Sequence, residues 1–531
     1  MVRPGIKNGT TMIWSLHSVS PLLAGSSPTL SAASSRCRGF LCGVLLASLS
    51  IAAPAQQPNP ANTTVIHVQS RLVVLDVVVT GKDGKPLAGL TKHDFTVFED
   101  GQPQTIRNVE YTTIAGNSKT SGFKSVFVLD ALNSTLEESA YGKAQLERYL
   151  GTQPETLPQP AMMVTVDDRG FQMIAPYTRD RRVLQQALHS YREGIPFDFD
   201  RGDNEARLTI TFDALRQIAL AGEGSPGRTE LIWLGHGFPG INISTMPPET
   251  AAPLQALVQN ITNLLLDARI VVYKVDPAAV GAAAVTPDVD DTDSAFDDTA
   301  QPYADSISFD NVIQQTGGHS FFNRNDVDTQ VSNAVDLGGS FYTISYSPSN
   351  ASNVAAGYRH IRVKVDQPGV KTVTRQGYFH IEPTAAPVAV ANPAGLVDAA
   401  IINNLAYTAL GIQSEGLVLA PTSASTRCMI RIDPKDIHWT TESDGSRIMN
   451  LLVGAATYTA DNKPLTYTRD YAALHMDASD DTDPALYATF EVPVHIPAAA
   501  ASMRIIVLAE ETGKLGSLNI FPIPAGAHSP K

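Results

Sequence analysis

Short apolar runs alternate with helical patterns through the middle of the chain. Residues 126–129 form an unbroken apolar run that ends at Asp130, and residues 137–151 then place apolar side chains at helical spacing. An unbroken apolar run of this length is typical of a strand that is buried on both faces. Because the same alternation continues to about residue 335, the pattern predicts a mostly parallel sheet with helices on both faces.

One connection in this region is too short for a parallel pair of strands. Residues 161–166 and 171–175 are both apolar-rich, and only the Asp-Asp-Arg-Gly turn at 167–170 separates them. Since parallel neighbours need a crossover of about a dozen residues, these two strands are expected to be antiparallel. Two further strands are predicted at 229–235 and 269–275.

Alternating apolar and polar positions flank this α/β region on both sides. Residues 63–120 hold β-branched runs and an Asp-Gly turn at 100–101, which is a strong hairpin signal. Residues 339–382 return to the same alternation. We therefore expect the two groups of strands to pair into one β domain, into which the α/β domain at 121–338 is inserted.

The last part of the chain follows an Ala- and Pro-rich linker at 383–394. A helix is predicted at 396–412, and strands rich in β-branched residues come after it. The predicted fold class is thus an α/β doubly wound domain inserted in a β domain, plus a C-terminal all-β domain of immunoglobulin-like type at 395–531.

Length and charge narrow the range of functions. The chain has 531 residues, which is enough for two to four domains. Its net charge is −14, and no basic stripe occurs along it. Because phosphate binding needs clustered Lys and Arg, a nucleic acid is not expected as a partner.

The N-terminus has the composition of a targeting segment. Two arginines precede the apolar run at 39–51, and the small-residue pattern Ala-Pro-Ala follows at 53–55. The run is too short for a comfortable membrane span. We therefore predict that residues 1–55 are a signal segment, that the mature chain has no transmembrane span, and that the protein is exported to the periplasm, the outer surface or the medium. The alternative is an uncleaved signal anchor.

Five motifs carry a family resemblance. They lie at 89–101 (Gly-Leu-Thr-Lys-His-Asp-Phe-Thr-Val-Phe-Glu-Asp-Gly), 128–133 (Val-Leu-Asp-Ala-Leu-Asn), 226–239 (Pro-Gly-Arg-Thr-Glu-Leu-Ile-Trp-Leu-Gly-His-Gly-Phe-Pro), 342–348 (Tyr-Thr-Ile-Ser-Tyr-Ser-Pro) and 358–363 (Tyr-Arg-His-Ile-Arg-Val). Together, over roughly residues 65–380, they resemble the VWFA-related family, which is known mainly from acidobacteria. The α/β region resembles a von Willebrand factor type A (VWA) domain.

The resemblance implies a non-enzymatic domain that binds a protein ligand, often through a metal ion at the carboxyl-end edge of the sheet, here called the crest. The family pattern there is Asp-x-Ser-x-Ser, a later Thr, and an Asp after the fourth strand. Asp130 and Ser134 match the first Asp and the last Ser, and Leu132 replaces the middle Ser. Thr209 lies at a suitable spacing for the Thr, and Gly-His-Gly at 235–237 stands where the late Asp would be.

A degenerate metal-ion-dependent adhesion site is therefore implied, with Asp130, Ser134 and Thr209 as the ligands of Mg²⁺ or Mn²⁺. Loss of one hydroxyl and one carboxylate weakens such a site, because Mg²⁺ favours near-octahedral oxygen coordination. Asn133 could add a carbonyl oxygen, whereas His236 would suit zinc or copper better. The alternative is that Asp130 and Asn133 only hydrogen-bond the turn between strand and helix, with no metal.

Other candidate chemistry is weak. The acidic loop at 288–298 lacks the spacing of an EF-hand, and charge runs of this kind are usually solvated. No nucleophile elbow, zinc-protease motif or phosphate-binding loop occurs in the sequence. Cys428, the sole cysteine after residue 55, lies in a predicted strand and is expected to be a core residue.

The sequence thus predicts an exported, non-catalytic binding protein that recognises a protein ligand or mediates adhesion. The expected contact surface is the crest, which adds Asn133, Gly235, His236 and Gly237 to the three ligand positions. A structural component of the cell envelope with an inert crest is the alternative, and a hydrolase is a distant third.

Overall fold

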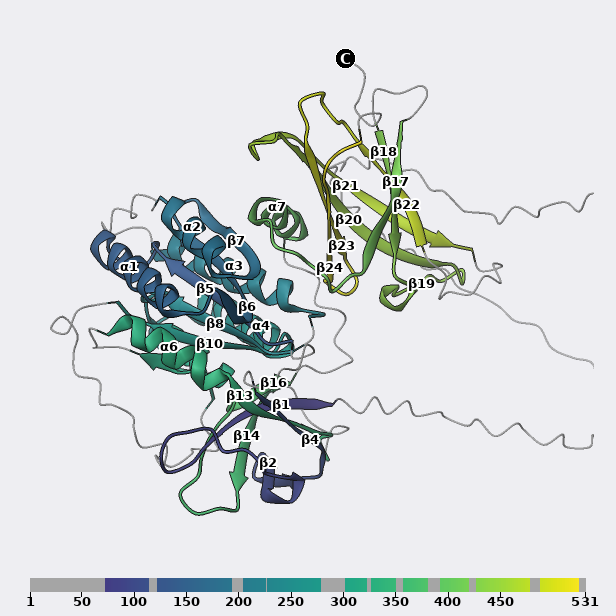
Figure 1. Cartoon of the computed structure of the whole chain (residues 1–531). Coiled ribbons are helices and arrows are strands. Elements are labelled where there is room, and N and C mark those ends of the chain that lie inside the picture. Colours follow the sequence, from purple (N-terminus) through teal and green to yellow (C-terminus); the bar gives the residue numbers. More distant parts are fainter. Residues whose placement is uncertain are drawn as a thin grey trace, which may run out of the picture. The chain divides into compact units, whose positions relative to one another are not determined.

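The computed structural model describes most of the chain between residues 72 and 524 (Figure 1). The gaps within this range are 114–121, 193–203, 226, 278–300, 322–325, 350–356, 381–391, 420–425 and 478–487. The predicted signal segment at 1–55 and the acidic loop at 288–298 lie outside the described residues. None of the described helices is both long and apolar enough to cross a membrane.

The α/β region contains a six-stranded sheet, as its apolar runs predict. In spatial order its strands are β12 (Ser320–Phe321), β10 (Ile270–Val275), β8 (Thr229–Leu234), β5 (Lys124–Asp130), β6 (Thr156–Asp167) and β7 (Gly170–Asp180). Neighbouring strands are parallel except β6 and β7, which the short turn at 167–170 forces to be antiparallel. The chain leaves β5 toward β6 and later returns to its other side at β8, so the strand order reverses between β5 and β8. Binding sites of open α/β sheets lie at such a reversal, at the carboxyl ends of the strands.

Helices cover both faces of this sheet. One face packs against α1 (Leu136–Thr152), α2 (Arg181–Ser190) and α6 (Val327–Gly338), and the other against α3 (Asn204–Gly222), α4 (Pro248–Asp267) and α5 (Phe309–Thr316). Successive side chains of a strand point to opposite faces. In β5, Phe127 therefore joins the core on the α1 side, and Val128 joins the core on the α3 side. Both are fully or almost fully buried, which explains why the run is apolar without alternation.

Strands from before and after the α/β region pair with one another. One sheet has the order β15 (Lys371–Val373), β1 (Val73–Thr80), β13 (Ser340–Tyr346) and β4 (Ile106–Thr113). The other has the order β16 (Gly377–His380), β14 (Gly357–Val365), β2 (Phe95–Glu99) and β3 (Gln102–Gln104), with a short helix, η1 (Lys92–Asp94), leading into β2. The α/β region is therefore an insertion in a β domain, whose core includes buried side chains from both groups of strands.

The C-terminal region begins with a helix that is shorter than predicted. Helix α7 (Pro393–Asn403) ends where Asn404 adopts a left-handed conformation, with φ of 59°. The side chain of Asn403 accepts a hydrogen bond from the backbone of Leu405, which supports this helix end. The prediction of a helix to residue 412 was wrong, because Ile412 already belongs to a strand.

Two β-sheets follow α7. One has the order β17 (Ile412–Leu419), β18 (Thr426–Ile432) and β22 (Ala488–Val494). The other contains β19 (Thr440–Thr441), β20 (Arg447–Tyr458), β23 (Ser502–Ala509), β24 (Leu515–Ile520) and β21 (Pro464–Met476), the last paired with β20. Cys428 is fully buried in the core that both sheets share, as the sequence predicts.

Candidate binding crest

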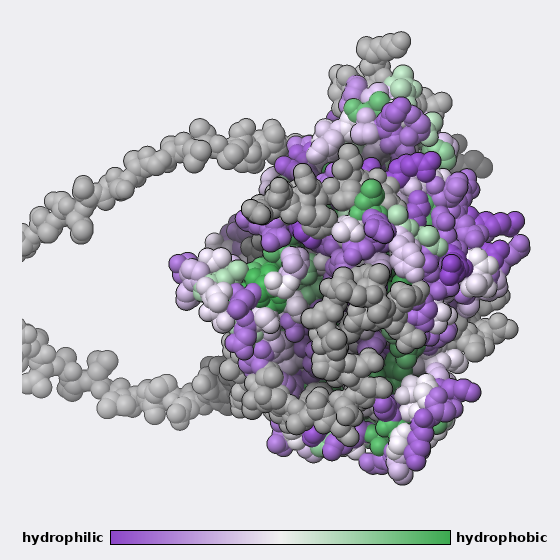
Figure 2. Space-filling model, turned by 90° about the vertical axis from the view of Figure 1, so that its left-hand side faces the viewer, coloured by the Kyte–Doolittle hydropathy of each residue, from purple (hydrophilic) through white to green (hydrophobic). Residues whose placement is uncertain are grey.

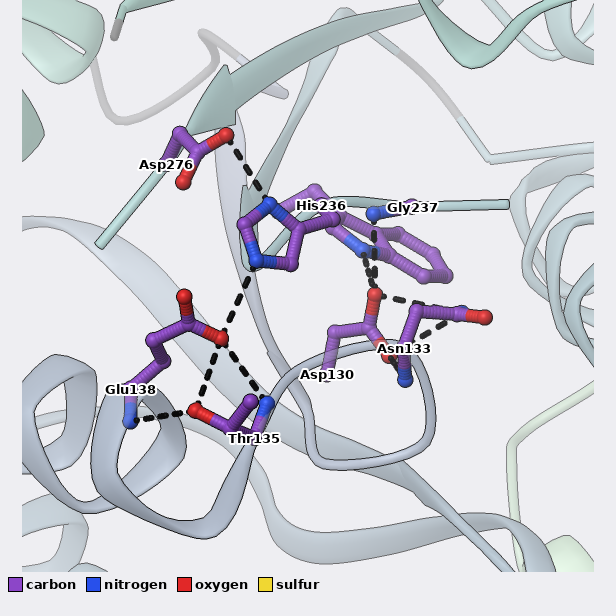
Figure 3. Close-up of polar contacts among 8 residues, drawn as sticks. Asp130, Asn133, Thr135, Glu138, His236, Gly237 and Asp276 are labelled. Atoms are coloured by element: carbon purple, nitrogen blue, oxygen red, sulfur yellow. Dashed lines mark hydrogen bonds and ion pairs between the residues drawn. The ribbon is translucent and has the colours of Figure 1, made fainter. Parts of the chain in front are cut away.

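The crest is formed where β5, β8 and β10 end side by side (Figure 3). Because these strands are parallel neighbours, the residues that follow them meet at one edge of the sheet. They are 130–134 after β5, 235–237 after β8, and Asp276 after β10. The structure thus brings together every predicted crest residue except Thr209.

Asp130 is the central polar group of the crest and is almost fully buried. Its Oδ2 accepts hydrogen bonds from Trp233 Nε1 at 2.8 Å and from the backbone N–H of Gly237 at 3.0 Å. Its Oδ1 accepts from the backbone N–H of Asn133 at 2.9 Å and from Asn133 Nδ2 at 3.2 Å. Burial raises the pKa of the Asp130 carboxyl, while these donors act in the opposite direction. Both carboxylate oxygens are therefore occupied by donors from the chain itself.

Asn133 connects Asp130 to helix α3. Its Nδ2 also donates to Thr211 Oγ1 at 3.1 Å, and its Oδ1 accepts from Arg207 Nε at 3.2 Å. The side-chain carbonyl oxygen of Asn133, which could have served as a metal ligand, therefore already has a cationic partner.

Thr211 takes the place at the crest that the sequence assigned to Thr209. Thr209 is exposed, and its hydroxyl donates to the backbone oxygen of Glu205 at 2.8 Å. Residues 207 and 211 are one helical turn apart and share a face, whereas residue 209 lies on the far side of that turn. The spacing of Arg207 and Thr211 was the sequence signal that could have identified this face.

Two glycines allow β8 and its loop to approach the other crest elements. Gly235 has φ of 143°, and a Cβ there would lie 2.5 Å from the Cβ of Asp130 and 2.9 Å from Ser134 Oγ. Gly237 has φ of 69°, and a Cβ there would lie 2.3 Å from the ring of Phe309. Neither position has room for a side chain. His236 is held between these two tightly packed positions.

His236 is hydrogen-bonded to two carboxylates (Figure 3). Its Nδ1 lies 3.0 Å from Asp276 Oδ2, and its Nε2 lies 3.1 Å from Glu138 Oε2. An ionised carboxylate only accepts hydrogen bonds, so both ring nitrogens have to donate, which requires the imidazolium form. In agreement, the hydrogen bond to Asp276, assisted by that to Glu138, raises the pKa of His236 to about 9 against the opposing effect of burial.

The local sequence at the start of α1 fixes the position of Glu138. Thr135 and Glu138 form a capping box, in which Thr135 Oγ1 accepts the backbone N–H of Glu138 at 3.2 Å. In return, Glu138 Oε2 accepts the backbone N–H and the hydroxyl of Thr135, both at 2.8 Å. The same oxygen accepts from His236. The Thr-x-x-Glu pattern was visible in the sequence but was not connected with the crest.

The crest does not fit the octahedral metal site that the VWA resemblance implies. Both oxygens of Asp130 and the side-chain oxygen of Asn133 accept hydrogen bonds from the protein. Ser134 Oγ is buried and has no hydrogen-bond partner in the described part of the chain, but a single hydroxyl does not hold a hard cation. No group of three or more His, Cys, Asp or Glu side chains among the described residues is placed to hold a metal ion.

The geometry of the crest also shows whether Ser134 and His236 could act as a nucleophile and its general base. A serine nucleophile requires a hydrogen bond to a general base. Within the described residues, Ser134 Oγ has no hydrogen-bond partner, and the nitrogens of His236 face carboxylates. The two side chains therefore do not form an activated pair.

Comparisons with known proteins give weak structural similarities. No family model matches the chain, and no curated protein sequence matches it. Proximal thread matrix protein 1 from mussel byssus is similar at 11% identity and a TM-score of 0.23, over 41% of this chain and 48% of that one, or about half its length. BatB from Bacteroides thetaiotaomicron is similar at 12% identity and a TM-score of 0.23, over 41% of this chain and 98% of that one. The SpRpn10 VWA domain is similar at 13% identity and a TM-score of 0.17, over 29% of this chain and 74% of that one.

Proposed function

We propose that this protein is an exported, non-catalytic binding protein whose crest contacts a protein partner. The observation that carries the proposal is the arrangement of His236 between Glu138 and Asp276. These contacts join the start of α1, the loop after β8 and the end of β10 at the place where open α/β sheets bind their ligands. A surface fixed in this way loses little conformational freedom when it binds.

The crest also has an exposed apolar side chain. Leu136 is the first residue of α1, and 54% of its surface is exposed. It follows directly after Thr135, whose side chain belongs to the capping box. An apolar side chain next to a fixed polar group is a favourable anchor for a partner, since the polar group supplies specificity. Among the coloured residues on the face shown in Figure 2, hydrophilic residues predominate and hydrophobic residues form separate areas.

A structural role in the cell envelope is the second candidate, and the surface of β21 supports it. Tyr467 and Tyr471 are exposed on this strand, which pairs only with β20 among the described strands. An unpaired strand edge with aromatic side chains is suited to contacts that do not involve the crest. Export and the immunoglobulin-like type of the C-terminal domain are proposed on the sequence pattern alone.

Site-specific crosslinking distinguishes the two candidates. A photoreactive amino acid is placed at Leu136 on the crest, at Tyr467 on β21, or at Leu257 on α4, a matched position that is also exposed. If the crest binds a protein, intact cells give a discrete adduct from position 136 and none from position 257. An adduct from position 467 alone would favour the structural role and contradict the crest proposal.

A further inference from the structure

We propose that the crest has exchanged a metal ion for a protonated histidine, and therefore binds its partner without a divalent cation and selects a partner that presents a basic side chain. This inference rests on the proposed function of the crest as a protein-binding surface. The hydrogen bonds of the crest occupy the oxygens that a metal site of the implied type would need.

The position of His236 supports the exchange. The neighbouring residue, Gly237, donates its backbone N–H to Asp130, so His236 belongs to the loop that contacts the carboxylate that would be the first metal ligand. Its two nitrogens then reach Glu138 on α1 and Asp276 after β10. A cationic ring thus connects the elements that a bound cation would otherwise connect through its ligands.

Within the described part of the chain, Ser134 is the one predicted metal ligand whose side-chain oxygen has no hydrogen-bond partner. Ser134 is 1% exposed, and its hydroxyl has no partner within the described residues. A divalent ion beside it would have to break at least one of the hydrogen bonds of Asp130, and it would also lie near the cationic side chain of Arg207, which interacts with Asp130. Repulsion between like charges at close range opposes this arrangement.

The charges of the crest favour a basic partner. Among the partly exposed side chains of the crest, Glu138 and Asp276 contribute two carboxylates and His236 contributes one cation, so this trio has one excess negative charge. Asp130 is buried, but the side chains of Glu138, His236 and Asp276 are 24%, 33% and 16% exposed.

A partner at this surface would meet two carboxylates and a histidine whose nitrogens already face them. An acidic side chain would find repulsion and no unused imidazole N–H to bind. A lysine or arginine side chain would instead find carboxylate oxygens that accept its hydrogen bonds. The net charge of −14 on the whole chain also attracts a basic partner as it diffuses toward the protein.

The first experiment tests the exchange of metal for histidine. Thermal unfolding of the full chain is measured with Mg²⁺, with Mn²⁺ and with EDTA, for wild type, His236→Asp and the control His189→Asp on the exposed part of α2. We expect no saturable shift for wild type or the control. His236→Asp replaces the cation by a third exposed carboxylate and should gain a saturable rise with Mn²⁺, on the order of 2–4 °C.

Wild type alone can overturn this part of the inference, even if His236→Asp does not fold. A saturable rise of wild type with Mg²⁺ or Mn²⁺ that Asp130→Ala abolishes would show that the crest is a metal site. If His236→Asp folds, as judged by its circular dichroism, and gains no response to Mn²⁺, the exchange is also contradicted.

The second experiment tests the class of partner. Fluorescence polarisation compares a labelled hexapeptide with three arginines and a hexapeptide of the same length with three glutamates. We expect saturable binding of the basic peptide in EDTA, weakened about tenfold by Asp276→Asn and unchanged by Asp461→Asn, a control in an exposed turn. Equal binding of the acidic peptide, or no effect of Asp276→Asn, would overturn the selection of basic partners.

The outcomes separate this inference from the proposed function. If position 136 crosslinks a partner and EDTA abolishes the adduct, the crest binds protein but the inference fails. If position 136 gives no adduct while the metal and peptide experiments have the expected results, the proposed function fails and the chemistry of the crest stands.

Discussion

Ionisable side chains differ in burial and pairing between the two ends of the strands of the six-stranded sheet. At the crest, the charge of His236 is matched by two carboxylates at 3.0 and 3.1 Å, and all three side chains reach solvent. At the opposite edge, here called the base, Arg228 and Glu230 lie at the start of β8 and are fully buried. The crest therefore presents paired charges to the outside, whereas the base keeps its ionisable groups inside the protein.

The buried side chains at the base have few hydrogen-bond partners, and this affects the pKa of Glu230. Arg228 donates to the hydroxyl of Tyr273 at 3.0 Å and lies over the ring of Phe341, at 4.9 Å from its centroid. Both oxygens of Glu230 lack a hydrogen-bond partner within the described residues. Burial holds the pKa of the Glu230 carboxyl well above its usual range, despite the nearby charge of Arg228. A buried group of this kind is out of reach of a partner in solution, whereas the paired charges of the crest are partly exposed.

Arg228→Ala is expected to have the largest effect on stability. The variant removes a buried guanidinium together with its hydrogen bond to Tyr273 and its contact with the ring of Phe341. The resulting cavity and the unpaired Tyr273 hydroxyl should cost about 2–5 kcal/mol in the free energy of unfolding. Thermal unfolding compares this variant with Arg148→Ala, whose side chain is mostly exposed on α1 and should lose less than about 0.5 kcal/mol. Similar losses in the two variants would contradict the distinction between the base and the surface.

The pH dependence of the stability of Glu230→Gln tests whether the buried carboxyl at the base is neutral. Because the folded-state pKa of Glu230 is raised, its contribution to stability is fully present below the ordinary value near 4.5 and is lost as the pH rises through the folded-state value. The glutamine variant should lack this decline, so its stability relative to wild type increases from pH 5 to pH 8. A constant difference over this range would argue against a buried neutral carboxyl.

His236→Ala is expected to cost about 1–2 kcal/mol at pH 7, after allowance for the solvent screening of a side chain that is 33% exposed. Since the folded-state pKa is raised from 6.5 to about 9, the stabilisation is fully present below pH 6.5 and is lost as the pH rises through about 9. The difference from wild type should therefore become small at pH 10. His189→Ala, at an exposed position of α2, is the matched histidine control, and a pH dependence of the same size in that variant would contradict the assignment to His236.

Thr135→Ala is expected to cost about 1 kcal/mol, because it removes the cap of α1. It should also lower the pKa of His236, since the variant no longer fixes the carboxylate of Glu138. Ser308→Ala removes a comparable capping box from α5 and provides the control. If both variants lose similar stability and only Thr135→Ala changes the titration of His236 by NMR, the cap positions the crest. Equal titration curves would contradict that role.

The smallest expected effect is the difference in the free energy of unfolding between Thr211→Val and Thr209→Val. The hydroxyl of Thr211 accepts a buried hydrogen bond from Asn133, so its loss should cost about 1 kcal/mol. Thr209 is exposed and bonds only the preceding turn of its own helix among the described contacts, so its replacement should be nearly neutral. Chemical denaturation measures both, and a larger cost at Thr209 would contradict the assignment of Thr211 to the crest.

The sequence predicts the sheet because its signals are local. The apolar run at 126–129, the short turn at 167–170 and the alternation on both sides of the α/β region each depend on nearby residues. The helix at 396–412 was predicted too long, since apolar spacing continues past Asn404 and only the backbone conformation of that residue ends the helix. The local pattern of apolar residues does not predict the left-handed conformation of Asn404.

The partners at the crest could not be predicted in the same way. His236 meets Glu138 and Asp276, which are 98 and 40 positions away in the chain. The sequence identifies each as a residue near a strand or helix end, but not the side-chain directions that place them within hydrogen-bond distance. For the same reason, sequence spacing points to Thr209, although Thr211 is the residue that faces the crest.

The protonation state of His236 tests the central claim most directly. Nitrogen-detected NMR of ¹⁵N-histidine-labelled protein, assigned with His236→Gln, follows both ring nitrogens from pH 5 to pH 10 in EDTA and again in Mg²⁺. The account predicts that both nitrogens are protonated at pH 7, with an apparent pKa of about 9 that Mg²⁺ does not change. A neutral ring at pH 7, or a titration that shifts when Mg²⁺ is added, would contradict the claim that the histidine has taken the place of a metal ion.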